Sequence, residues 1–120
     1  MVEQCLINTI SSVRGRWLLD DHQEAASELA LNGMHDGQLV RATVDRTFIC
    51  NEGLRWVVDY KTGGPASGES ADCFMAREAA RYAGQLQLYA ALVGQFKPGG
   101  PPLRRALYFP LFDGWFEVDS

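Results

Sequence analysis

The sequence predicts an α/β fold in which an antiparallel meander and a following strand form a central mixed sheet flanked by helices. Residues 24–61 consist of short apolar runs separated by turn residues, a pattern typical of strands. Residues 71–96 carry apolar side chains at intervals of three and four, which is typical of a helix lying on a sheet. With 120 residues and 47% apolar content, the chain is expected to form one globular domain.

The first segment is predicted to be an amphipathic helix, because apolar residues recur at helical spacing from Val2 to Trp17. We expect this helix to be interrupted near Gly15, since glycine weakens helix interiors. The segment has no obvious N-cap residue at its beginning. We therefore expect residues 1–120 to be a C-terminal fragment of a longer protein.

Three strands are predicted between residues 24 and 61, because turn residues divide this stretch. The first turn is expected at Asn32-Gly33 together with Asp36-Gly37, and the second at residues 51–53. A flexible loop rich in Gly and Ser should follow at residues 62–71. The three strands should therefore form the meander of the sheet.

Period-2 alternation assigns side chains to the two faces of these strands. One face of the middle strand is expected to carry its apolar side chains, which are Val40, Ala42, Val44 and Phe48. The opposite face carries Asp45. In the third strand Asp59 and Lys61 share one face. The middle strand thus carries Asp45 on one face, and the third strand carries Asp59 on one face.

The second half of the chain continues with a long helix and a hairpin. The helix over residues 71–96 should end at the Pro- and Gly-rich stretch 97–102. Residues 103–118 are predicted to form a strand that turns at Asp113-Gly114 into a short partner, because this dipeptide favours tight hairpins.

The acids of the second hairpin are predicted to face each other. If the turn is centred on Glu52, Asp45 lies directly opposite Asp59. The Cβ atoms of such a pair are about 5 Å apart, so the two carboxylates repel unless a cation lies between them. Oxygen ligands of this kind favour Mg²⁺ or Mn²⁺. Lys61 projects from the same face, where its ammonium group can orient a water or stabilise charge on a phosphate.

Composition excludes several other classes of protein. A net charge of −4 argues against an autonomous nucleic-acid binder, so any DNA must be delivered by another component. The three cysteines lack the spacing of a zinc site or disulfide framework and are expected to be small buried or half-buried residues. Neither a signal peptide nor a membrane-spanning stretch is recognisable, so we expect a cytoplasmic protein without membrane contact.

Three motifs occur in succession along the chain. They are Val44-Asp45-Arg46, then Trp56-Val57-Val58-Asp59-Tyr60-Lys61-Thr62-Gly63, and then Arg81-Tyr82 continuing through Gln85-Leu86 to Tyr89-Ala90. In order and spacing they resemble three motifs of the RecB-like nucleases of the PD-(D/E)xK superfamily. More narrowly, residues 17–116, including Ser27-Glu28-Leu29, are similar to the nuclease domain at the C-terminus of superfamily 1 (UvrD/Rep-type) helicases of the exonuclease V beta type.

The resemblance implies a restriction-endonuclease-like core and a Mg²⁺-dependent (or Mn²⁺-dependent) deoxyribonuclease that hydrolyses phosphodiester bonds. Asp45 and Asp59 correspond to the metal-binding carboxylates, and the backbone carbonyl of Tyr60 to a further ligand. Lys61 corresponds to the catalytic lysine. The resemblance also implies that the module is an exonuclease in recombination or repair, located at the bacterial nucleoid. A helicase domain of the parent chain would supply the DNA, and other subunits would be partners.

Residues outside the acid pair have supporting roles in this interpretation. In the family, the residues matching Gln85 and Tyr89 face the active site and help to place the DNA strand. Arg81, Gln85 and Tyr89 follow one another at intervals of four residues and therefore form one column along the helix. Glu28, in the first strand, is a candidate to join the acids or to support Lys61.

Other interpretations of the same residues remain open. Asp59 and Lys61 can form a mere surface ion pair, and the helical column can be a solvated face. The fold can also serve as a non-catalytic module that guides DNA or docks partner subunits, or as a purely structural interaction domain. The family commonly has a metal-ligand histidine on an upstream helix, and His22 lies too near the strands to match it. We therefore expect that ligand outside this chain and little activity from the fragment alone.

Overall fold

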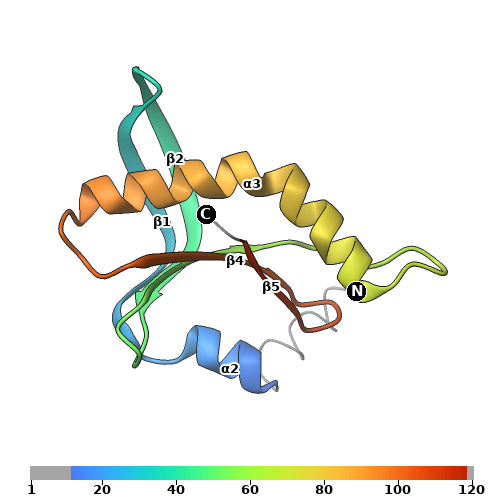
Figure 1. The fold of residues 1–120 in the computed structure, drawn as a ribbon. Helices are drawn as coiled ribbons and strands as arrows, with labels where there is room; N and C mark the ends of the chain where they lie inside the picture. Colours follow the sequence, from blue (N-terminus) through green and yellow to red (C-terminus); the bar gives the residue numbers. More distant parts are fainter. Residues whose placement is uncertain (1–11, 119–120) are drawn as a thin grey trace.

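The structure, a computed structural model, describes residues 12–118. Its elements are α2 (Val13–Leu19), β1 (Gln23–His35), β2 (Gln38–Ile49), β3 (Arg55–Tyr60), α3 (Ala71–Phe96), β4 (Leu103–Phe109) and β5 (Gly114–Val118). The strands form one sheet in the order β1-β2-β3-β4-β5. β3 and β4 run parallel and the other neighbours run antiparallel. With α3 across one face and α2 against the other (Figure 1), the predicted α/β fold with a mixed sheet is confirmed.

α2 is a short helix that is fixed to the sheet by its cap and by one buried arginine. Ser12 caps it, because the hydroxyl accepts a hydrogen bond from the N–H of Gly15 at 2.8 Å. Gly15 lies buried inside the helix, which begins two residues before it, after Ser12 in an extended conformation. Arg46 donates to the carbonyl oxygen of Leu18 at 2.8 Å, which satisfies a carbonyl at the helix end. The part of the predicted helix before residue 12 lies outside the described residues.

The β1–β2 hairpin is longer than the sequence predicts. β1 runs through Asn32-Gly33, and the chain reverses only at Asp36-Gly37, so the turn expected at the first of these pairs is wrong. A Cβ atom on Gly33 would lie 2.6 Å from the Cδ2 atom of Leu92 on α3. Gly33 thus allows a close approach of the helix to the strand and makes no turn.

The two ends of β2 pack against opposite sides of the sheet. Val44 packs with α3 residues, whereas Phe48 packs with Leu18 of α2. The prediction that Val44 and Phe48 share a face is therefore wrong. The change occurs beside Glu28 of β1, which has a positive φ of 52° and lies between two regularly paired positions of the ladder. A left-handed residue in a strand changes the local twist, so strict alternation fails there.

The rest of the chain folds as the sequence predicts. α3 covers Ala71–Phe96, with Ser70 as its N-cap, and β4 and β5 form the expected hairpin. Trp56 is 8% exposed and Trp17 packs against the same cluster, so both belong to the core on the α2 side of the sheet. No helix within residues 12–118 is long and apolar enough to cross a membrane. Cys73 is exposed, which differs from the expectation for the cysteines.

Candidate active site

Asp45 and Asp59 come together because β2 and β3 pair in the predicted register. The ladder pairs Arg46 with Val58 and Thr47 with Val57, so the next positions along both strands are those of the two acids. The backbone N–H of Tyr60 donates a hydrogen bond to Oδ2 of Asp45 at 2.8 Å, which fixes this carboxylate against β3. Asp59 is 4% exposed. The buried carboxylate of Asp59 therefore lies beside the half-buried carboxylate of Asp45.

This environment makes ionisation of Asp59 unfavourable. The pKa of Asp59 is raised from 3.8 to about 6, first by burial and then by the neighbouring Asp45 carboxyl through hydrogen bonding and charge, against the opposing effect of Lys61. Lys61 Nζ lies 2.7 Å from Oδ2 of Asp59, yet this buried oxygen accepts no well-aligned hydrogen bond. A buried carboxylate oxygen in this state is a candidate ligand for a cation.

α3 supplies the remaining neighbours of Lys61. Gln85 Oε1 lies 3.3 Å from Lys61 Nζ, and Gln85 Nε2 donates to the hydroxyl of Tyr89 at 2.6 Å. The ring centre of Tyr82 is 3.7 Å from the same ammonium group. The sequence motifs pointed to Gln85 and Tyr89, whereas Tyr82 stands in the same motif without an expected role at the site. Its position three residues before Gln85 was the signal for this contact.

The donors at the acid pair fit a hard divalent cation. Both side chains offer carboxylate oxygens, which suit Mg²⁺ or Mn²⁺ better than zinc. Within residues 12–118 no group of three His, Cys, Asp or Glu side chains is close enough to hold a metal. Asp45 and Asp59 are therefore the two side-chain acids available to an ion here, and further ligands would be amide or backbone oxygens, water or groups outside the described residues.

The comparison with known families agrees with this arrangement. The sequence profile of the PD-(D/E)XK nuclease superfamily matches residues 7–114. The chain belongs to the PD-(D/E)XK nuclease superfamily. Nucleases of this superfamily generally use divalent metals. Asp59-Tyr60-Lys61 matches the (D/E)XK part of the signature, while Val44 precedes Asp45 where the signature has proline. A search of curated proteins gave no match.

Three other polar residues singled out in the sequence lie apart from the acid pair of this PD-(D/E)XK domain. Glu28 is exposed and does not join the two acids in a cluster of three. Arg81 is exposed, with Nη1 3.8 Å from a carboxylate oxygen of Glu78. His22 stacks on Phe48, with ring centres 4.2 Å apart, on the other side of the sheet. His22 is thus part of the core packing.

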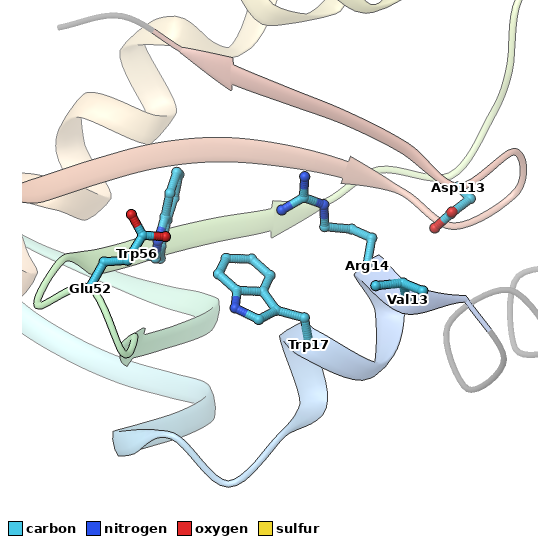
Figure 2. Close-up of a pocket in the computed structure, with 6 residues that line it drawn as sticks. All are labelled: Val13, Arg14, Trp17, Glu52, Trp56 and Asp113. Carbon is cyan, nitrogen blue, oxygen red and sulfur yellow. The ribbon is translucent and has the colours of Figure 1, made fainter.

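A cavity of the PD-(D/E)XK domain lies away from its acids. It measures about 620 Å³ and lies between α2 and the sheet (Figure 2). Its lining residues are Val13, Arg14, Trp17, Glu52, Trp56 and Asp113. Trp56 packs with Leu18 on the α2 side, whereas Lys61 contacts α3 on the other side. The cavity is therefore separate from the proposed reaction site.

The raised pKa of Asp59 predicts how the stability of the metal-free domain changes with pH. The folded state holds the Asp59 proton more tightly than the unfolded state, so the free energy of unfolding falls as pH rises from 3.8 to about 6. The expected loss is about 2 to 3 kcal/mol. Asp59→Asn should lack this loss. Urea unfolding of both proteins in EDTA at several pH values measures the difference, and identical pH dependence would contradict the assigned environment.

Proposed function

We propose that the domain is a Mg²⁺-dependent (or Mn²⁺-dependent) deoxyribonuclease of the RecB-like type that hydrolyses phosphodiester bonds. The observation that carries this proposal is the pairing of Asp45 with a buried Asp59 directly beside the ammonium group of Lys61. Superfamily membership supports nuclease chemistry. The all-oxygen donor set supports a hard cation.

Each residue of the site has a distinct task in this proposal. Asp45 and Asp59 would hold the ion, together with the backbone carbonyl of Tyr60. A bound divalent cation supplies Lewis acidity and lowers the pKa of a coordinated water. Lys61 orients the attacking water or stabilises the charge that develops on the phosphate. Its 17% exposure strengthens such electrostatic effects, because little water screens them.

α3 provides the polar groups nearest to the proposed path of the DNA strand. Gln85 contacts both Lys61 and Tyr89, so one amide links the catalytic amine to the helix. We propose that Gln85 and Tyr89 help to place the scissile phosphate. Arg81 is exposed on the same helix and is available to a more distant phosphate. Glu28, exposed on β1, remains a candidate for supporting Lys61.

DNA delivery by a helicase is part of the proposal. The net charge of −4 gives the domain little attraction of its own for a phosphate backbone. The motif resemblance supports a place at the C-terminus of a superfamily 1 helicase of the exonuclease V beta type, acting as an exonuclease in recombination or repair with other subunits as partners. Such an enzyme works in the bacterial cytoplasm at the nucleoid. A histidine ligand from outside residues 12–118 would complete the metal site.

A second candidate function is a module that guides DNA without cutting it. The observation that favours it is the pair of acids without a third side-chain ligand among residues 12–118. The complete set of Asp45, Asp59 and Lys61 favours the enzyme, because a guiding surface needs no buried acid pair.

Digestion of linear DNA by the full-length protein distinguishes the two functions. We expect digestion with Mg²⁺ or Mn²⁺ and none with EDTA. The isolated chain should bind these ions weakly and cut slowly, because two carboxylates provide few protein ligands. DNA binding without any metal-dependent cleavage by the full-length protein would support the guiding module and contradict the nuclease.

A further inference from the structure

The ammonium group of Lys61 lies against the face of an aromatic ring. Its Nζ atom is 3.7 Å from the ring centre of Tyr82, within the range of a cation–π interaction. The same atom lies 2.7 Å from Oδ2 of Asp59 and 3.3 Å from Oε1 of Gln85. The three neighbours come from β3 and from one turn of α3. Together these three neighbours define the position of the Lys61 ammonium group.

The ring is held in a defined place by the helix. Tyr82 is half-buried on α3, one turn before Gln85. The helix around it is anchored to the sheet by Leu86, which is fully buried, and by Ala79. The exposed Arg81 also lies near the ring, with Cζ 5.2 Å from the centre, which is farther than Lys61. The mostly buried amine of Lys61 therefore has the closer contact.

A divalent cation that binds at the acid pair would affect the contacts of Lys61 differently. The carboxylate of Asp59 is the neighbour for which a divalent ion would compete. For the Tyr82 ring and the Gln85 carbonyl oxygen we propose no such competition. A ring face attracts an ammonium group through its quadrupole and requires no free lone pair.

We propose that Tyr82 is a positioning residue that holds the Lys61 ammonium at the acid pair through the face of its ring. The inference rests on the proposed nuclease function of the same site and adds a residue to it. Tyr82 acts through Lys61 and does not touch the reacting atoms. The ring face is the required feature, so phenylalanine serves in its place and an aliphatic side chain of similar length does not.

Kinetics of metal-dependent cleavage test this role. In the full-length protein, Tyr82→Leu should lower kcat about tenfold, which corresponds to the strength of a partly desolvated cation–π contact, and leave KM within about twofold. Tyr82→Phe should restore most of kcat. Phe96→Leu is the matched control, because it makes the same aromatic-to-leucine change at an exposed position near the end of α3. A normal kcat in Tyr82→Leu, or no rescue by Tyr82→Phe, would overturn the proposal.

An NMR signature tests the contact without any cleavage. Protons above a ring face are shielded, so the Lys61 ε-methylene resonances should lie upfield in the wild type and in Tyr82→Phe, and at ordinary positions in Tyr82→Leu. Unshifted resonances in the folded wild type would overturn the contact. This readout separates the two proposals. If Lys61→Ala still cuts DNA and the wild type shows the upfield shift, the nuclease assignment fails and the cation–π contact stands.

Discussion

Replacing Asp59 by Asn, or Lys61 by Ala, is expected to lower metal-dependent DNA hydrolysis by about a thousandfold or more. Asp59→Asn removes the charge of a buried carboxylate that would hold the cation, and the amide is a much weaker ligand for it. Lys61→Ala removes the ammonium group that lies 2.7 Å from this carboxylate. The rate of nucleotide release from linear DNA, measured at saturating Mg²⁺, checks both variants.

Two controls make this result specific to the site. Glu117→Gln removes an exposed acid of β5 that pairs with Arg104 on a different part of the sheet, and it should cut DNA at the wild-type rate. ATPase activity of the full-length protein should persist in all three variants, because the proposed helicase motor is a separate domain. Full nuclease activity in either Asp59→Asn or Lys61→Ala would refute the assignment of the site.

The register of the acid pair could be predicted because it depends on a short, local turn. Residues 50–54 connect β2 to β3, and Gly53 has a positive φ of 75° that suits glycine in such a turn. A tight connection fixes which residues face each other, so Asp45 and Asp59 follow from the position of Glu52. The helix bounds were likewise predictable, since Ser70 caps α3 and a Pro-rich stretch follows it.

The faces of β2 and the role of Gly33 could not be predicted because they depend on distant contacts. The alternation of side chains between two faces assumes a regular strand, and a glutamate at position 28 does not indicate a positive φ. Asn32-Gly33 is a typical turn dipeptide, yet here the glycine makes room for a helix about sixty residues farther along the chain. Tertiary packing overrides local propensity in both cases.

Tyr82 was missed as a neighbour of the site for a different reason. Helical periodicity assigns an aromatic residue at this spacing to the apolar stripe, and the pattern does not show that Lys61 reaches the ring from β3. A side chain can belong to the packed face of a helix and still contact a polar group at its edge. Sequence patterns therefore find the charged centre of a site more readily than the apolar groups that hold it in place.

The central claim is that Asp45 and Asp59 share one divalent cation, and paramagnetic broadening by Mn²⁺ tests it most directly. In ¹⁵N-labelled protein, small additions of Mn²⁺ should first broaden the backbone amide signals of Asp45, Asp59 and Tyr60, since the Tyr60 amide is hydrogen-bonded to the Asp45 carboxylate. The effect should be lost in Asp45→Asn. Broadening that begins elsewhere, or that is unchanged in this variant, would contradict the account.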